Sequence, residues 1–234
     1  MKTIGLIGGM SWESSKTYYE YVNTMVKEQL GDSHSAKVIM TSVDFAEIEK
    51  LTFEGNWNKI GDIIGNESIK LEKAGADMVL LCTNTIHLVS ERITTSVAIP
   101  FFHIAHVTGE AIKNQGLKKV ALLGTRFTME MDFYTKILKE DYGLEIIIPN
   151  VEERQLIHDI IYKELVKGIL TKKSKDVYLK IINNLEKQGA EGIIAGCTEI
   201  PLLISPEDIS VPLFDTTRLH SAKAVTVALN QQKN

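Results

Sequence analysis

The sequence predicts an α/β protein with two similar domains, each a parallel sheet flanked by helices, related by a pseudo-twofold axis. Apolar, strand-sized runs alternate with helical stretches, which is typical of parallel sheets covered by helices. Two phrases also nearly repeat each other, LEKAGADMVLLCTNT at 71–85 and LEKQGAEGIIAGCTEI at 185–200. The 234 residues suffice for one large domain or two small ones, at about 100–200 residues per domain.

The first half of the chain contains the first copy of the repeated unit. Buried strands are expected at 3–7, 37–43, 77–81 and 98–102. Helices are expected at 13–30, at 57–73 and directly after Cys82. Gly75 follows the second of these helices and is the C-terminal glycine that many helices require.

The second half repeats this order. Strands are expected at 118–125, 144–148, 192–195 and 211–215, and helices at 129–142, 151–170 and 177–187. Matched elements in the same order favour a duplication over coincidence.

Composition excludes several classes of function. The formal net charge is −4 and no long basic run occurs, so we expect no nucleic-acid partner. No apolar stretch approaches the roughly 20 residues of a membrane helix, and the N-terminus reads as a first strand rather than a signal peptide. Two cysteines do not make a disulfide framework, so we expect reduced thiols and a cytoplasmic protein.

The candidate site lies where the strands end. Ligands of open parallel sheets bind beyond the carboxyl ends of the strands. The loops 8–11, 82–85, 124–125 and 197–199 all fall there, so we expect both domains to contribute to one cleft.

Cys82 and Cys197 are the candidate acid/base residues. They lie 115 residues apart (197 − 82), and each follows a strand and precedes an expected helix. A helix N-terminus lowers the pKa of a thiol, so one thiolate could remove a proton and the other thiol could return one. A single cysteine is more often a buried core residue. The pair at equivalent positions favours function.

The neighbouring loops supply candidate ligands for a carboxylate. These are Gly9, Met10, Thr83, Asn84, Thr85, Thr125 and Thr198. The alternatives are a tight turn at Gly8 and Gly9, helix capping by the threonines and loop support by Asn84. Glu199 either tunes the Cys197 thiol or caps the following helix, and capping is the favoured interpretation.

The histidines do not predict a metal site. His87, His103 and His106 lie close in sequence, but no four-ligand zinc spacing occurs. We expect no metal. The other histidines, His34, His158 and His220, are expected at the surface or in packing.

Four phrases, IGLIGGMSWES, LCTNTIH, VALLGT and GCTEIPLL, resemble the cofactor-independent aspartate/glutamate racemase family, which includes broad-specificity amino-acid racemases. The resemblance covers essentially the whole chain. It implies that the C-terminal segment returns to the first domain, giving domains of 1–103 plus about 214–234, and 104–213. It further implies an isomerase that acts on a small-molecule amino acid, with Cys82 and Cys197 on opposite faces of the α-carbon. Neither pyridoxal phosphate nor another cofactor is implied, and the family often forms homodimers.

The chain departs from parts of this family. Cell-wall glutamate racemases begin with Asp-Ser-Gly and carry histidine after the second Cys-Thr, where this chain has Gly-Gly-Met-Ser and Glu199. Several aspartate racemases place an arginine in the loop after the second strand, and 42–49 has none. Lys167 resembles a substrate-facing lysine and is a candidate replacement cation, although a solvent-exposed lysine is the simpler interpretation.

Other functions remain open. Hydantoin racemases, maleate isomerases and decarboxylases share the fold expected from the resemblance, and paired cysteines suit the first two. A non-catalytic module that binds a carboxylate would need the loops but not the paired thiols.

Overall fold

The computed structural model describes residues 1–230 of the chain, which fall into two compact units. Unit 1 comprises Met1–His103 and His220–Asn234, and unit 2 comprises Ile104–Leu219. The last four residues of the expected first domain, 231–234, lie outside the described part.

The strands are β1 (Ile4–Gly8), β2 (Val38–Ser42), β3 (Met78–Leu81), β4 (Lys119–Gly124), β5 (Glu145–Ile147), β6 (Ile193–Gly196) and β7 (Leu213–Asp215). The α-helices are α1 (Trp12–Leu30), α2 (Phe45–Phe53), α3 (Trp57–Lys73), α4 (Glu91–Ser96), α5 (Ile104–Asn114), α6 (Arg126–Glu130), α7 (Asp132–Glu140), α8 (Val151–Lys163), α9 (Lys172–Lys187), α10 (Ile200–Leu203) and α11 (Thr216–Leu229). Three short 3-10 helices are η1 (Thr85–Val89), η2 (Leu165–Lys167) and η3 (Pro206–Asp208).

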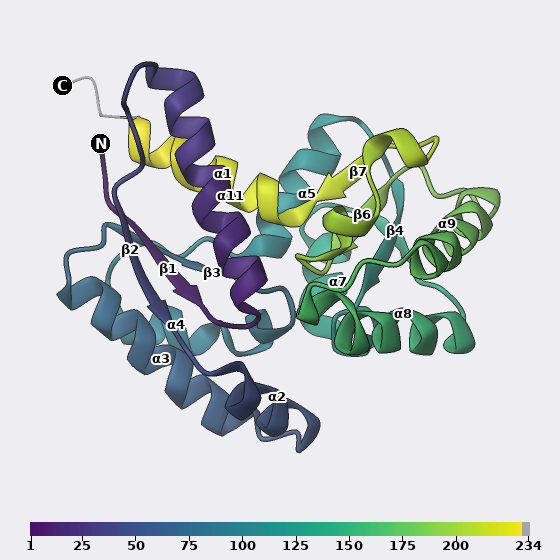
Figure 1. The fold of residues 1–234 in the computed structure, drawn as a ribbon, viewed down its shortest axis with the longest axis horizontal. Coiled ribbons are helices and arrows are strands. Elements are labelled where there is room, and N and C mark those ends of the chain that lie inside the picture. The colour runs from purple at the N-terminus through teal and green to yellow at the C-terminus, as the bar shows by residue number, and fades with distance from the viewer. Residues whose placement is uncertain (231–234) are drawn as a thin grey trace. The chain divides into compact units, whose positions relative to one another are not determined.

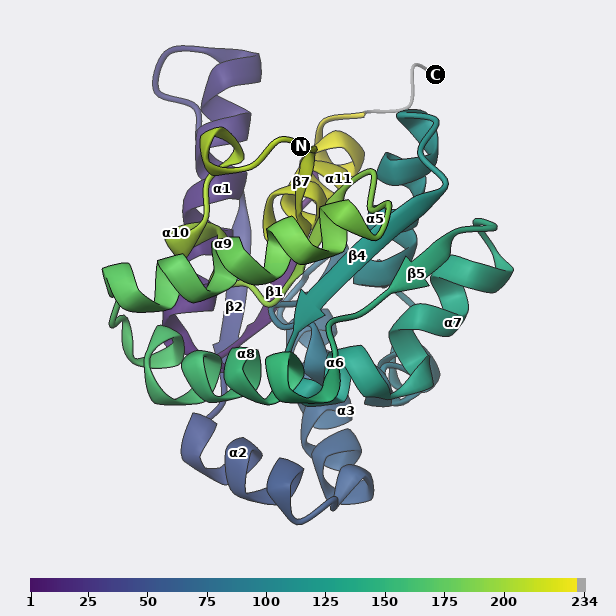
Figure 2. The same ribbon diagram turned by 90° about the vertical axis from the view of Figure 1, so that its right-hand side faces the viewer.

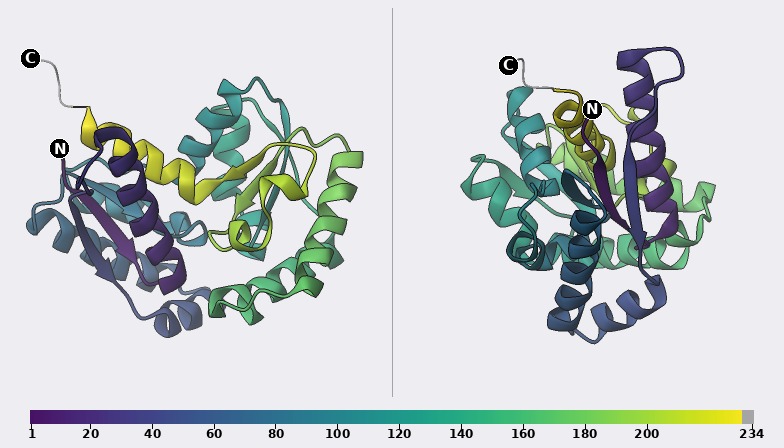
Figure 3. Two further views of the ribbon diagram at one scale, coloured as in Figure 1. Left: turned by 45° about the horizontal axis from the view of Figure 1, so that its top comes forward. Right: turned by 90° about the vertical axis from the view of Figure 1, so that its left-hand side faces the viewer.

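Unit 1 is built on a parallel sheet of order β2-β1-β3 (Figure 1). Side chains alternate between the two faces of a strand. Ile4 and Leu6 therefore pack against α1 and α11, whereas Ile7 packs with α2, α3, η1 and α4 on the other face. A second view of this unit shows α1 lying along the strands (Figure 3). The strands β1 and β3 are buried on both faces, which explains why they carry no polar side chain, whereas the edge strand β2 is partly exposed.

Unit 2 has a parallel sheet of order β5-β4-β6-β7 around one apolar core. Helices α8 and α9 cover one face, and α5 and α7 cover the other (Figure 2). The hydroxyl of Tyr134 on α7 donates to Thr108 Oγ1 on α5 at 3.2 Å, which ties these two helices together. Helix α8 begins with a capping box between Asn150 and Glu153, so its start is fixed by local sequence. Parallel sheets flanked by helices, the predicted fold class, are thus confirmed in each unit.

The expected fourth strand of unit 1 is wrong. Residues 98–102 form only an isolated bridge, in which Phe101 pairs with Val79. The next helix, α5, begins at Ile104, so the pairing stops after one residue pair. The equivalent segment in unit 2, β7, continues to Asp215, which pairs with Ala195.

The return of the chain to unit 1 also differs from expectation. Because β7 pairs with β6, residues 214–219 belong to unit 2, and unit 1 resumes at His220 rather than near 214.

Three expected helices differ from those in the structure. The helix at 129–142 is instead α6 and α7, separated at Met131, whose backbone is extended (φ −91, ψ 147). The helix at 151–170 ends at Lys163, and Gly168 has a left-handed backbone (φ 70). Helix α9 begins at Lys172, earlier than expected, where the Thr171 side chain caps it.

Candidate functional site

Cys82 lies at the carboxyl edge of the unit 1 sheet. Ile7 and Leu81 are register partners, so the loops that follow β1 and β3 leave this edge side by side. The Cys82 side chain is 0% exposed, and its N–H donates to the Ile7 carbonyl at 2.9 Å. The Ser14 hydroxyl on α1 donates to the Cys82 carbonyl at 2.8 Å. Hydrogen bonds to both of its backbone groups thus fix the position of Cys82.

His87 fixes Thr83, the residue that follows Cys82, through a hydrogen bond. Its Nδ1 lies 2.7 Å from the carbonyl oxygen of Thr83, and because a carbonyl only accepts, Nδ1 carries the hydrogen. Burial, together with the nearby His103 and His220, holds the pKa of His87 well below its usual value. His87 is therefore a neutral donor that fixes the Cys82–Thr83 loop.

The predicted lowering of the Cys82 pKa is wrong for this structure. The helix after Cys82 is η1, a five-residue 3-10 helix that begins only at Thr85, so its dipole is short and set back from the sulfur. Burial raises the pKa of the Cys82 thiol instead. Thr83, Asn84 and Thr85 are all buried in this loop, and their role as substrate ligands stays a prediction.

Gly9 and Met10 have structural roles. The Gly9 N–H donates to Ser15 Oγ at 2.8 Å, so this amide is already engaged within the protein. Gly9 has φ +93, and a Cβ there would lie 2.2 Å from the Val43 carbonyl oxygen. The close approach requires glycine, which supports the tight-turn alternative. Met10 is 5% exposed and packs in the core beneath α2 and α3.

Cys197 lies at the corresponding edge of the unit 2 sheet. Gly124 and Gly196 are register partners, so Thr125 and Cys197 follow adjacent strands. Thr125 Oγ1 accepts from the Thr128 N–H at 3.3 Å and caps α6, as the capping alternative predicts. Within each unit, therefore, a cysteine and a hydroxyl-bearing loop meet at one edge.

Glu199 contacts the Cys197 thiol directly. The Cys197 Sγ donates to Glu199 Oε2 at 3.0 Å, and the Thr198 hydroxyl donates to the same oxygen at 2.8 Å. All three side chains are at least nine-tenths buried. The Glu199 side chain makes no capping hydrogen bond to α10, so the favoured capping interpretation is wrong and the thiol-tuning alternative agrees with the contact.

The expected lowering of the Cys197 pKa is also wrong. Burial raises the pKa of this thiol well above its usual value, and the charge of Glu199 and its hydrogen bond from the thiol raise it further. Helix α10 has four residues and begins at Ile200, so it offers little opposing dipole.

Lys167 lies on η2 in unit 2 and is exposed to solvent. Its predicted role as a cation for substrate stays a prediction.

Three histidines of unit 1, His87, His103 and His220, form a packed cluster. The His87 ring centroid lies 4.7 Å from that of His103 and 5.8 Å from that of His220. The His220 Nε2 donates to the Phe102 carbonyl at 2.7 Å, so its Nδ1 accepts from the Tyr18 hydroxyl at 2.8 Å. Within residues 1–230 no group of three His, Cys, Asp or Glu side chains is arranged to hold a metal ion.

Two supporting residues were missed by the sequence reasoning. Ser14 and His87 hold the carbonyls of Cys82 and Thr83. His87 follows the first Cys-Thr phrase directly, and this proximity was an available signal. Ser14 comes from a distant helix and left no local signal in the sequence.

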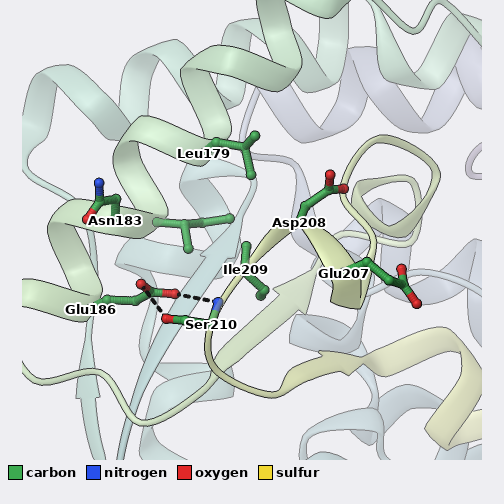
Figure 4. Close-up of a pocket in the computed structure, with 8 residues that line it drawn as sticks. Leu179, Asn183, Glu186, Glu207, Asp208, Ile209 and Ser210 are labelled. Carbon is green, nitrogen blue, oxygen red and sulfur yellow. Dashed lines mark hydrogen bonds between the residues drawn. The ribbon is translucent and has the colours of Figure 1, made fainter.

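A pocket of about 450 Å³ lies between α9 and the segment that contains η3 (Figure 4). Glu186 accepts from the hydroxyl and N–H of Ser210 across it, and Glu207 and Asp208 also line it. None of the predicted site residues contributes to its lining. Three carboxylates would repel an anionic substrate, so this pocket is a poor candidate for the site.

The sequence profile of the Asp/Glu/hydantoin racemases matches residues 7–224. The chain belongs to this family. A crystal structure of a Yersinia pestis protein assigned as an Asp/Glu racemase is 49% identical, with a TM-score of 0.91 over 98% of this chain and all of that one. An aspartate racemase homologue from Pyrococcus horikoshii OT3 is 37% identical, with a TM-score of 0.84 over 97% and 99%.

Curated relatives and more distant structures extend the comparison. The broad-specificity amino-acid racemase RacX of Bacillus subtilis is 24% identical over 98% of this chain and 99% of its own. The glutamate racemase of Francisella tularensis is 15% identical with a TM-score of 0.69, which shows a shared fold. This member of the racemase family contains no helix within residues 1–230 that is long and apolar enough to span a membrane.

Proposed function

We propose that this chain is an amino-acid racemase that needs no cofactor and uses Cys82 and Cys197 on opposite faces of the substrate α-carbon. The supporting observation is the equivalent placement of the two thiols. Cys82 follows β3 and Cys197 follows β6, and each of these strands pairs with the first strand of its own sheet. Membership of the racemase family and the racemases among its relatives support the same reaction class.

In the proposed reaction, one cysteine as thiolate removes the α-proton and the other cysteine as thiol protonates the opposite face. Both sulfur atoms lie in buried surroundings, where the interaction of charged groups with the substrate is stronger than in water. Buried hydroxyls of Thr83, Thr85 and Thr198 are the proposed ligands of the α-carboxylate, together with Asn84 and Thr125. Gly9 and Met10 are proposed to border the substrate only by their position, because the Gly9 amide donates to Ser15 Oγ and the Met10 side chain packs in the core.

The proposed substrate class is left broad. The segment after β2 begins α2 and carries Asp44, Glu47 and Glu49 but no arginine. These charges do not favour a second substrate carboxylate near this segment. Lys167 is the proposed cation if aspartate or glutamate is bound.

Racemisation of single enantiomers, measured by chiral chromatography, tests the proposal. The panel is aspartate, glutamate, homoserine and neutral amino acids, with a hydantoin and maleate included for the alternative reactions. Cys82→Ser and Cys197→Ser should each reduce racemisation by at least about 10³-fold, because a hydroxyl is far less acidic than a thiol. Solvent deuterium should enter the α-position of both enantiomers.

Full racemase activity in either serine variant would overturn the mechanism. A different result would favour a non-catalytic binding module. In that case no substrate is turned over, and carboxylate ligands raise the melting temperature equally in the native protein and in both variants. A homodimer stays a prediction, which sedimentation velocity tests.

A further inference from the structure

We propose that Glu199 is a positioning residue that acts through Cys197, and that the two side chains form a proton relay at this thiol. The inference deepens the proposed function and rests on it. It starts from one contact, the hydrogen bond from the Cys197 thiol to Glu199 Oε2 at 3.0 Å.

The contact sets where the shared proton lies when Glu199 is ionised. A carboxylate that accepts from a thiol carries the negative charge, while the sulfur keeps its proton. Thr198 donates to the same oxygen at 2.8 Å, which holds the carboxylate toward the sulfur. Glu199 is 2% exposed and Cys197 8%, so this contact between thiol and carboxylate is buried.

Other titratable groups around the pair favour the same state. Tyr178 on α9 is fully buried, and within the described residues its hydroxyl has no hydrogen-bond partner. Burial, and then the charges of Cys197, Glu199 and Glu164, raise the pKa of Tyr178, so the phenol stays neutral. The carboxylate of Glu164 is held by hydrogen bonds from Thr171 and Ser174. A second negative charge on Cys197 is therefore disfavoured while Glu199 is ionised.

The relay resolves how so buried a thiol can work as a base. The thiol proton first moves along the hydrogen bond to Glu199 Oε2, leaving a thiolate beside a neutral carboxyl group. The thiolate then takes the α-proton of the substrate, whose C–H electron pair stays on the α-carbon. The reverse sequence returns a proton to the carbon and restores the thiol and the carboxylate. No oxidant or external base enters the step.

Among residues 1–230, no carboxylate makes an equivalent hydrogen bond with the thiol of Cys82. Its hydrogen bonds run through its backbone, to Ile7 and from Ser14. The residue two positions after Cys82 is Asn84, which cannot accept a proton as a base does. The two halves of the duplication therefore differ at the position that matters for proton storage.

The first test measures the thiol itself and needs no turnover. In a Cys82→Ser background Cys197 is the remaining thiol, and its alkylation by iodoacetamide is followed by mass spectrometry from pH 6 to the highest pH at which circular dichroism shows folded protein, so that the range includes the bend of a thiol whose pKa is raised. The accessibility of the Cys197 thiol changes the alkylation rate by the same factor at every pH. Its pKa instead sets the pH at which the plot of rate against pH bends. Glu199→Gln keeps the size of the side chain but removes the charge, so the bend should move to lower pH by about one unit or more, a tenfold change in thiolate fraction.

Two variants control this measurement. Glu199→Asp keeps a carboxylate and should leave the bend near its position in the Cys82→Ser parent. Glu152→Gln removes an exposed carboxylate from α8 of the same unit and should not move it. Profiles of the parent and Glu199→Gln that superimpose after scaling would overturn the coupling, whether or not the protein is a racemase.

The second test uses racemisation of α-deuterated substrates. Glu199→Gln should lower kcat in both directions by roughly 10²-fold, as loss of a general acid–base partner does. The primary isotope effect should rise for the enantiomer whose proton Cys197 removes and fall for the other. Isotope effects in both directions that are unchanged from those of the native enzyme would overturn the relay even if both cysteines prove essential. A variant is used in either test only if its circular dichroism spectrum shows that it is folded.

Discussion

The two cysteines occupy equivalent positions but have different chemical surroundings. Cys82 is held through its backbone by neutral donors and acceptors, and burial alone raises its pKa. Cys197 donates to a carboxylate, which adds to the effect of burial on its pKa. A single residue difference, Asn84 against Glu199, accounts for the distinction. Duplicated folds can thus carry unequal acid/base groups on matching strands.

Ser14 should matter for both stability and activity. Ser14→Ala leaves the buried Cys82 carbonyl without its hydroxyl donor, so we expect the free energy of unfolding to fall by about 1–3 kcal/mol. The racemisation rate should fall by roughly tenfold, since small displacements of a reacting group are costly. Lys16→Ala, an exposed change on the same helix, is the control for urea denaturation and chiral assays. Equal stability and activity in both variants would contradict the positioning role.

Residue types at the candidate site could be predicted, but their environments could not. Cys-Thr at the end of an apolar strand predicted where Cys82 and Cys197 lie in their sheets, because the strand pattern is local. The direction of their pKa shifts was wrong, since it depends on burial and on how many residues the next helix contains. Glu199 was correctly singled out by its position, while its contact with sulfur rather than α10 depends on three-dimensional geometry.

At the scale of elements, most strands follow from the sequence because apolar runs bounded by glycine or polar residues are local signals. Helix α2 (Phe45–Phe53) was not expected, because its segment was interpreted only as a loop after β2. The division between α6 and α7 at Met131 has no proline or glycine to mark it. Tertiary packing decides such boundaries, and sequence periodicity does not contain that information.

The contact between α1 and α11 through Tyr18 and His220 predicts an acid-sensitive fold. Burial lowers the pKa of His220 to about 4, below its usual value of 6.5. Between these values the unfolded chain binds a proton that the folded chain does not, so stability falls as the pH drops from 6.5 to 4. The loss attributable to His220 is about 3 kcal/mol, at 1.36 kcal/mol for each unit of pKa.

Urea denaturation at pH 7 and pH 5 measures this effect. His220→Gln retains an N–H donor for the Phe102 carbonyl and should show a smaller drop in stability between these two values. His34→Gln changes an exposed histidine and should retain the native pH dependence. Identical slopes in native protein and His220→Gln would show that another group causes the acid sensitivity.

At the scale of the whole molecule, unit 1 is assembled from two separate stretches of the chain. Ala224, Val225 and Ala228 of α11 are buried in its core, and the Lys2 N–H donates to the Ala228 carbonyl at 2.9 Å. The stability of unit 1 therefore depends on the part of α11 from His220 onward, which is encoded after all of unit 2.

Ala224→Asp should destabilise unit 1 selectively. A buried carboxylate without a partner costs several kcal/mol, so amides of β1, β3 and α1 should exchange with solvent much faster than in native protein. Thr226→Asp, an exposed position on the same helix, should leave exchange unchanged. Hydrogen exchange followed by mass spectrometry resolves the units, and equally accelerated exchange in β4 and β6 would contradict the prediction.

The discontinuity of unit 1 has a consequence for biosynthesis. Chains fold as they leave the ribosome, at about 5–20 residues per second. Unit 2 has all of its residues before the polypeptide reaches His220, whereas the sheet face of Ile4, Leu6, Met78 and Leu80 still lacks α11, one of the two helices that cover it. Synthesis of Ile104–Leu219 takes about 5–20 s at this rate, and during that time the nascent chain presents an apolar sheet face that lacks α11. Chaperones that recognise exposed strands would find their binding site on the half of this protein that is translated first.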